Sequence, residues 1–131
     1  MTITKIDPPG LHPLIGGVHV TVAEGGRIIH VSGQTGVDAE GKVVSSDHRG
    51  QIAQALRNLE TALGAAGATF DDLVKLNFYI VDYSEAALTA LFEAAVEVAG
   101  ENLPTPASTL LGVAALWQPD LLVEIDAVAV V

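Results

Sequence analysis

The chain has 131 residues, with six Lys and Arg against sixteen Asp and Glu, a formal net charge of −10 and no cysteine. Half of the residues are hydrophobic, so a single domain spanning residues 1–131 has ample material for a core. The scattered cations argue against a nucleic-acid partner, and the missing cysteines exclude disulfides and thiolate chemistry.

The same composition bears on membranes and on the compartment. No apolar run approaches the roughly 20 residues that span a bilayer, so no membrane contact is expected. Residues 1–10 lack the basic and apolar pattern of a signal peptide, so a cytoplasmic protein is expected.

The first half of the chain predicts strands followed by a helix. Alternating valines predict a strand over residues 18–23, a Glu-Gly-Gly turn follows, and residues 27–32 form a second strand, so these two strands are expected to pair as a hairpin. A short strand at Thr2–Ile6 is a further candidate. Asp47 or Ser46 is expected to cap a helix that ends at Gly64 and Gly67, and its apolar stripe is Ile52, Leu56, Leu59 and Leu63.

The second half predicts strand, helix and two more strands. Apolar and polar residues alternate over 74–80, which is typical of a strand with one buried face. Ser84 is expected to cap a second helix, which the Leu-Pro-Thr-Pro run at 103–106 stops. The last two strands are expected at residues 107–113 and 121–131.

This order predicts an α+β fold, in which two helices cover one face of a mixed β-sheet. Both faces of the final strand are largely apolar, although helices can cover only one of them. The uncovered face is therefore expected to meet a partner subunit.

The chain resembles the RidA/YjgF family, also called endoribonuclease L-PSP proteins, over nearly its whole length. The matching segments, in the family's order and spacing, are 31–36 (VSGQTG), 51–59 (QIAQALRNL), 65–68 (AAGA), 71–75 (DDLVK), 81–82 (VD), 106–109 (PAST), 113–116 (VAAL) and 123–129 (VEIDAVA). The resemblance implies a chorismate-mutase-like fold and a homotrimer with an inner β-barrel and a ligand cleft at each subunit interface. It also implies hydrolysis of imines and enamines to 2-oxo acids and ammonia, without a metal or an organic cofactor.

Two residues of this sequence fall at positions that carry the family's chemistry. Ser108 stands where the family has an arginine that binds the substrate carboxylate. A serine offers one neutral hydroxyl in place of a bidentate cation, so efficient hydrolysis of small imino acids is not expected; a merely structural strand serine is the other interpretation. Glu124 matches the family's last-strand acid, which the resemblance makes the catalytic group, and the alternative is a solvated carboxylate beside Asp126.

Four further residues are candidates for the ligand-binding cleft. Ser32 and Gly33 match the family's Ser-Gly-Gln segment at the end of a strand, where building a turn and a subunit contact is the more conservative interpretation. Val18 replaces the tyrosine that walls the family's cleft. Trp117 either stacks on a flat ligand or packs in the core or an interface, the latter being preferred. The four histidines have no metal-site spacing.

Two functions from different classes remain open on the sequence. The first is a cofactor-free hydrolase or deaminase of an imine-like or enamine-like molecule, with Glu124 as general base on water. The second is a trimer that binds a small molecule or a partner in its clefts without turnover, which the replacement of the arginine and the tyrosine favours.

Overall fold

The computed structural model describes residues 1–14, 16–101 and 103–131. The elements that it contains are β1 (Thr2–Ile6), β2 (Val20–Glu24), β3 (Ile28–Thr35), α1 (His48–Ala65), the 3-10 helix η1 (Phe70–Asp72), β4 (Leu73–Val81), α2 (Glu85–Ala99), β5 (Ala107–Val113) and β6 (Val123–Val130).

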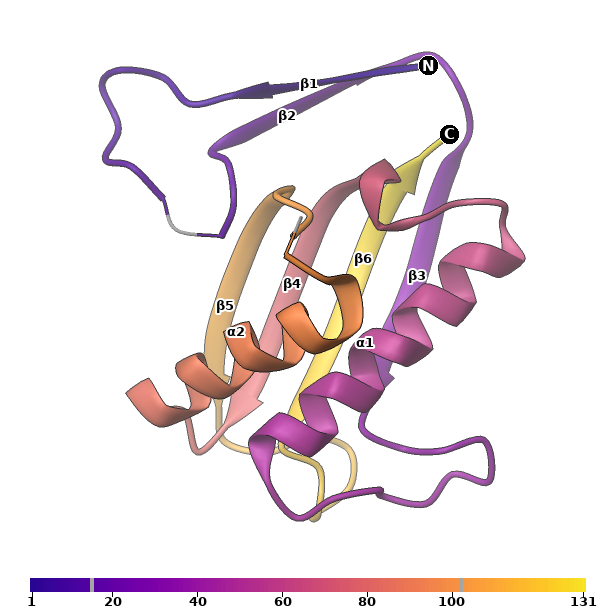
Figure 1. The fold of residues 1–131 in the computed structure, drawn as a ribbon, viewed down its shortest axis with the longest axis vertical. Helices are drawn as coiled ribbons and strands as arrows, with labels where there is room; N and C mark the ends of the chain where they lie inside the picture. The colour runs from indigo at the N-terminus through magenta and orange to yellow at the C-terminus, as the bar shows by residue number, and fades with distance from the viewer. Residues whose placement is uncertain (15, 102) are drawn as a thin grey trace.

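The main sheet has four strands in the order β3-β6-β4-β5 (Figure 1). Strands β4 and β5 run parallel and are joined by a crossover through α2, whereas β6 is antiparallel to both β3 and β4. Both helices lie on the same face of this sheet (Figure 1). The predicted α+β fold, a mixed sheet covered on one face by two helices, is confirmed.

The hairpin predicted between residues 18–23 and 27–32 is wrong, because β2 pairs with β1 in a separate two-stranded sheet. Gly25 and Gly26 have φ angles of 72° and 85°, and they turn the chain away from β2. Immediately afterwards Arg27 and Val131 exchange backbone hydrogen bonds, which begins the pairing of β3 with β6. The β1–β2 pair therefore lies beyond the upper end of the main sheet (Figure 1).

Both helices begin at the predicted caps. The carboxylate of Asp47 accepts a hydrogen bond of 2.8 Å from the backbone N–H of Gly50, and the hydroxyl of Ser84 accepts one of 3.1 Å from Ala87. Helix α2 ends at Ala99 because Gly100 adopts a φ of 78°, before the predicted stop at residues 103–106 is reached. Within the described ranges, no helix is both long and apolar enough to cross a membrane.

The helix-covered face of the sheet carries the core, and the other face is open. The largest side chains that are completely buried against the helices come from α1, β4 and β6: Ile52, Leu59, Leu63, Leu73, Ile80, Val123 and Ile125. The open face is less apolar than predicted, because the register groups polar residues of β4 with the acids of β6. These polar residues are Lys75, Asn77, Tyr79, Glu124 and Asp126.

Candidate functional site

Glu124 lies on β6 with its side chain over Gly33 of β3. An ideal Cβ added at Gly33 would lie 2.6 Å from Cδ of Glu124 and 2.8 Å from Cγ, closer than real Cβ atoms come to other heavy atoms. Only a glycine therefore leaves room for the carboxylate in this position. The two candidate residues are brought together by the pairing of β3 with β6.

Ser32 and Gly33 form an irregularity within β3. The register with β6 shifts between Val31 and Gln34, so the two residues between them form a bulge. The side-chain amide of Gln34 donates a hydrogen bond of 3.1 Å to the carbonyl oxygen of Ser32. The sequence placed this motif at the end of a strand, but β3 continues to Thr35 beyond it. Ser32 is exposed on this bulge and directly precedes Gly33, the residue that the Glu124 carboxylate covers.

A second polar cluster lies beside Glu124 on the open face. Asp126 accepts a hydrogen bond of 2.7 Å from the amide of Asn77 at Oδ1 and one of 3.0 Å from the hydroxyl of Tyr79 at Oδ2. Tyr79 is also the register partner of Glu124. The hydrogen bond to Asp126, burial, and the negative charges of Asp126 and Glu124 raise the pKa of the Tyr79 phenol.

The sequence interpretation missed Asn77 and Tyr79 as neighbours of the acids. Their alternation with apolar residues placed them on one face of a strand, but pairing with the last strand is a long-range contact that alternation does not specify.

Ser108 is not near Glu124 within one chain. Its register partner on β4 is Leu76, a core residue, whereas the partner of Glu124 is Tyr79, so the two side chains leave opposite faces of the sheet. The hydroxyl of Ser108 donates a hydrogen bond of 3.0 Å to the carbonyl oxygen of Pro106. The chain thus places Ser108 on the helix side and Glu124 on the open side.

Val18 lies beside Ser108 rather than beside Glu124. It forms a parallel bridge with Ala107, and its backbone N–H donates a hydrogen bond of 3.4 Å to the carbonyl oxygen of Pro106. The segment around Val18 therefore runs along the outer edge of β5. The structure brings together two of the candidates at this edge, and it keeps them apart from Glu124 and Gly33.

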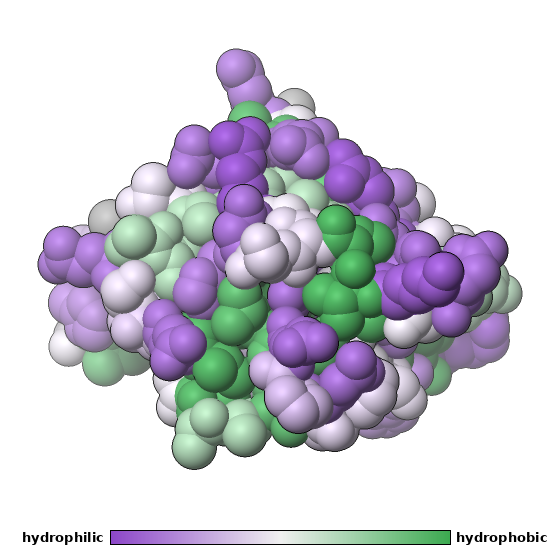
Figure 2. Space-filling model, turned by 90° about the horizontal axis from the view of Figure 1, so that it is seen from below, coloured by the Kyte–Doolittle hydropathy of each residue, from purple (hydrophilic) through white to green (hydrophobic). Residues whose placement is uncertain are grey.

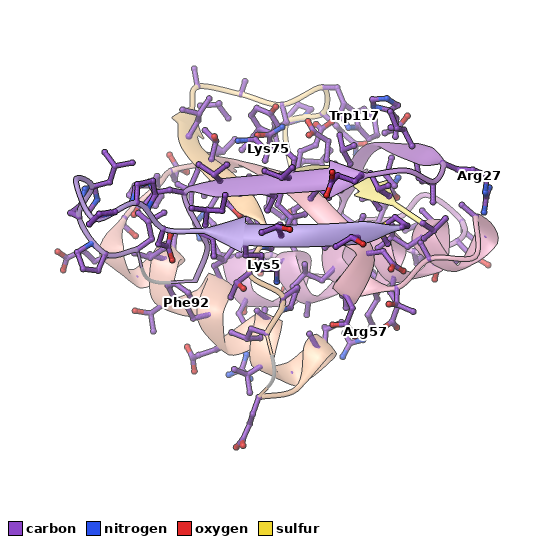
Figure 3. The ribbon with its side chains drawn as sticks, turned by 90° about the horizontal axis from the view of Figure 1, so that it is seen from above. Lys5, Arg27, Arg57, Lys75, Phe92 and Trp117 are labelled. Carbon is purple, nitrogen blue, oxygen red and sulfur yellow. The ribbon has the colours of Figure 1, made fainter. Side chains whose placement is uncertain are left out.

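Trp117 belongs to neither group. It lies on the loop before β6 with 67% of its surface exposed, so it does not pack in the core of this chain. Figure 3 shows it on the side of the sheet with Lys75, opposite to Phe92 and Arg57. Of the two preferred interpretations, core and interface, only the interface is compatible with this exposure.

The two arginines of α1 have partners away from Glu124. Arg49 and Arg57 of α1 form ion pairs of 2.8 to 3.4 Å with Glu93 and Glu97 of α2. The Arg57 hydrogen bond holds the pKa of the Glu97 carboxyl below its usual value. In the part of the chain that the structure describes, no ion pair reaches Glu124.

Arg27, Lys5 and Lys75 each make a single side-chain hydrogen bond. Arg27 donates to the carbonyl oxygen of Ala66, and Lys5 donates to the hydroxyl of Thr105 at 3.1 Å. Lys75 is the cation on the open face, and its ammonium donates to the hydroxyl of Thr109 at 2.9 Å. Lys75 pairs with Val128, four positions along β6 from Glu124, a separation of about 13 Å. This distance is too long for one small imino acid to reach both groups.

Histidines and acids do not gather into a metal site in the described residues. Across residues 1–14, 16–101 and 103–131, no group of three His, Cys, Asp or Glu side chains lies close enough to hold an ion. The Nε2–H of His19 donates a hydrogen bond of 2.7 Å to the carbonyl oxygen of His12, and the Nε2–H of His48 donates one of 2.8 Å to the carbonyl oxygen of Val81. Both are local structural contacts.

The fold and the open-face acid define a class of protein: a small α+β domain whose mixed sheet presents polar residues on its uncovered face. A model of the endoribonuclease L-PSP family matches residues 14–131. The chain belongs to this family, the RidA/YjgF family.

Characterised and structurally known relatives agree with this assignment. The chain is 31% identical over 128 residues to a 2-iminobutanoate/2-iminopropanoate deaminase of Salmonella typhimurium, covering 97% of this chain and 94% of the relative. It is similar to a Rid family protein of Yersinia pestis, described as of unknown function, with a TM-score of 0.90, 35% identity and full coverage of both chains. RidA of an Antarctic Psychrobacter superposes with a TM-score of 0.70 at 29% identity, covering 83% of this chain and 85% of that one.

Proposed function

We propose that the chain assembles as a homotrimer that binds a small molecule in clefts between subunits and hydrolyses an imine-like or enamine-like group there, with Glu124 as the general base. The observation that carries this proposal is the close approach of the Glu124 carboxylate to Gly33, which holds an acid at a strand bulge on the uncovered face. The deaminases to which the chain is similar support the reaction class.

The chemistry that Glu124 would perform is proton transfer to and from water. The carboxylate would take a proton from water as the water oxygen forms a bond to the imine carbon and the C=N electron pair moves to nitrogen. Glu124 would then return the proton to nitrogen. Glu124 would next move the hydroxyl proton of the resulting carbinolamine to its nitrogen. The C–N bond then breaks with its electron pair leaving on nitrogen as the C=O bond forms, so that imine and water yield ketone and ammonia. Every atom of this reaction is supplied by substrate and water.

A cleft that contains both Glu124 and Ser108 would need two copies of the chain. Their partners on β4, residues 79 and 76, are three positions apart, about 10 Å, and β5 and β6 flank β4, which adds about 9.5 Å across the sheet. The two side chains also leave opposite faces. In the proposed trimer, one subunit contributes its β5 edge, with Ser108 and Val18, to each cleft. The neighbouring subunit contributes the β3 bulge and β6, with Ser32, Gly33 and Glu124.

Trp117 would lie at the same junction between subunits. It is exposed on the loop that leads into β6, the strand that carries Glu124, and an aromatic side chain with this exposure is suited to an interface or to the wall of a cleft. Its place on the open side in Figure 3 is compatible with either role.

Binding without turnover is the second candidate function. The position of Ser108 carries no charge, and its hydroxyl proton is already donated to Pro106. A site of this kind has no fixed cation to orient a carboxylate substrate, so it would bind a ligand that needs no such orientation.

One assay separates the two functions. Ammonia release from 2-iminopropanoate is measured for the wild type, Glu124→Gln and Ser108→Arg, with Thr109→Arg as the matched control, because Thr109 lies on β5 next to Ser108 but faces the other side. The hydrolase proposal expects turnover to rise in Ser108→Arg, to stay unchanged in Thr109→Arg, and to disappear when Glu124→Gln is added.

The proposal of catalysis is overturned if no imine or enamine in a broad panel is hydrolysed in a Glu124-dependent way by either the wild type or Ser108→Arg. Sedimentation of each variant checks that it keeps the oligomeric state of the wild type, so that loss of assembly is not taken for loss of chemistry.

A further inference from the structure

A pocket of about 390 Å³ opens between α2 and the β4–β5 half of the sheet, on the face opposite to Glu124. Its walls come from β4 and β5 of the sheet and from α2, with further residues of α1, η1 and the neighbouring loops. The apolar lining residues of α2 and of the sheet include Leu76, Phe78, Leu91, Phe92, Ala95 and Leu110. Its size lies within the range of about 300–1,000 Å³ that is usual for small-molecule sites.

The lip of the pocket is built by a close approach of two segments. An ideal Cβ at Gly16, whose φ is 80°, would lie 2.9 Å from the ring of Phe92, so the loop lies directly against α2. An ideal Cβ at Gly17 would lie 3.2 Å from the carbonyl oxygen of Pro106 and 3.7 Å from the hydroxyl oxygen of Ser108. The two glycines thus let the loop pass between α2 and β5 without closing the pocket. Figure 3 shows Phe92 on this helix side of the molecule.

The lining selects against charged ligands. None of the described residues that line the pocket is charged, and Tyr83 and Ser108 are the polar ones with side chains on this side; Thr109 borders the pocket, but its hydroxyl faces the open side and accepts from Lys75. An anion would find no cation here, and the net charge of −10 would repel it. A cation would find no carboxylate to replace its hydration, so transfer into this apolar volume would cost free energy without compensation.

We propose that this pocket binds a neutral, mainly apolar small molecule, with the Ser108 hydroxyl oxygen accepting a hydrogen bond from the ligand at the mouth. Ser108 donates its proton to Pro106, so its oxygen keeps lone pairs for a ligand donor. This site does not depend on Glu124, which lies on the other face of the sheet, and it goes beyond the proposed hydrolysis.

The test compares two dyes with one aromatic skeleton. N-phenyl-1-naphthylamine is neutral and carries one N–H donor, and 8-anilino-1-naphthalenesulfonate is its anionic sulfonate. The neutral dye is expected to bind at one site per chain, with enhanced fluorescence and a raised Tm, and at least about tenfold more tightly than the sulfonate. Equal affinity for the two dyes, or no saturable binding of the neutral one, overturns the proposal.

Two variants place the binding site. Ala95→Phe fills the pocket from α2 and is expected to lower the affinity for the neutral dye at least about tenfold, whereas Ala86→Phe, on an exposed position of the same helix, should leave it unchanged. Ala99→Phe is the second filling variant if Ala95→Phe does not fold. Wild-type affinity in a folded filling variant contradicts the assignment.

A measurement on the wild type covers the case in which neither filling variant folds. With methyl-labelled leucine, the neutral dye should shift the NMR signals of Leu91 and Leu110 and leave that of Leu111, which is exposed on the other face, in place. Shifts confined to Leu111 or to leucines outside the pocket would overturn the proposal.

Discussion

The Glu124 carboxylate occupies the space that a side chain at Gly33 would fill. This contact joins the bulge of β3 to the last strand and sets the position of the acid on the open face. Because the obstacle to a larger residue is the side chain of Glu124 and not the backbone of a neighbour, the two positions are expected to be coupled.

The substitution Gly33→Ala should displace Glu124 from its present rotamer and lower the free energy of unfolding by about 1 kcal/mol. Gly10→Ala is the matched control, since no heavy atom lies within 4 Å of an added Cβ there. Urea denaturation of Gly33→Ala in the wild-type and Glu124→Ala backgrounds measures the coupling. The same loss of stability in both backgrounds would show that Glu124 is not the obstacle.

Gly36 and Gly64 should respond to alanine in opposite directions. Gly36 is buried, and an ideal Cβ there would lie 2.6 Å from Cβ and 2.7 Å from Cα of Gln51, which belongs to the backbone of α1 and cannot rotate away. Gly36→Ala is expected to cost about 2–3 kcal/mol by forcing α1 from the sheet. Gly64 is an exposed position of α1, and no heavy atom lies within 4 Å of an ideal Cβ added there. Gly64→Ala should therefore raise the free energy of unfolding by up to about 1 kcal/mol.

Chemical denaturation of both variants at one pH checks this pair. A stability of Gly36→Ala within about 0.5 kcal/mol of the wild type would mean that α1 and the β3 end move apart more easily than the packing of Gln51 suggests.

Local patterns in the sequence predicted most of the helices and strands, but they did not specify which strands pair with one another. The caps Asp47 and Ser84 depend on residues three positions away, and the alternation over 74–80 depends on neighbours in the same strand, so both are written locally. Whether β2 pairs with β1 or β3 depends on the direction in which Gly25 and Gly26 send the chain. Two glycines in a row permit several turns, and the sequence does not choose among them.

The candidate site was predictable in its residues but not in its geometry. The motif around Gly33 and the acid at Glu124 were found separately, and their contact follows from the β3–β6 register. Ser108 was placed in the same site, although its face is set by pairing with Leu76 on β4. The polarity of the open face was underestimated because β6 alone shows valines on that side, while Asn77 and Tyr79 come from another strand.

Gln51 is expected to be a principal polar contributor to stability. Its amide is completely buried, donates hydrogen bonds of 2.9 Å to the carbonyl oxygens of Ser45 and Asp120, and accepts one of 2.8 Å from the backbone N–H of Leu122. Gln51→Leu would leave these three groups without partners and should lower the free energy of unfolding by about 3 kcal/mol.

Gln54→Leu is the control for this substitution on the same helix. Gln54 is half-buried and donates a single hydrogen bond of 2.9 Å to the side chain of Asn58, so its replacement should cost less than about 1 kcal/mol. Guanidinium denaturation compares the two variants. Similar losses in the free energy of unfolding would indicate that water replaces Gln51 as the hydrogen-bond partner of the three backbone groups.

The Tyr79 phenol is expected to titrate above the ordinary range of a tyrosine. Its hydrogen bond to Asp126 favours the neutral phenol, and burial and the two nearby carboxylates oppose the phenolate, so its pKa is raised. A raised pKa in the folded state means that the contribution to stability is fully present below the ordinary tyrosine pKa of about 10 and is lost as the pH rises through the folded value. Phenolate absorbance as a function of pH should therefore include a component above the ordinary tyrosine range in the wild type. Tyr79→Phe should remove this component, and Asp126→Asn, which removes the charge and the strong acceptor, should move it to lower pH. A component that survives in Tyr79→Phe, or that Asp126→Asn leaves in place, would contradict the coupling of Tyr79 to Asp126.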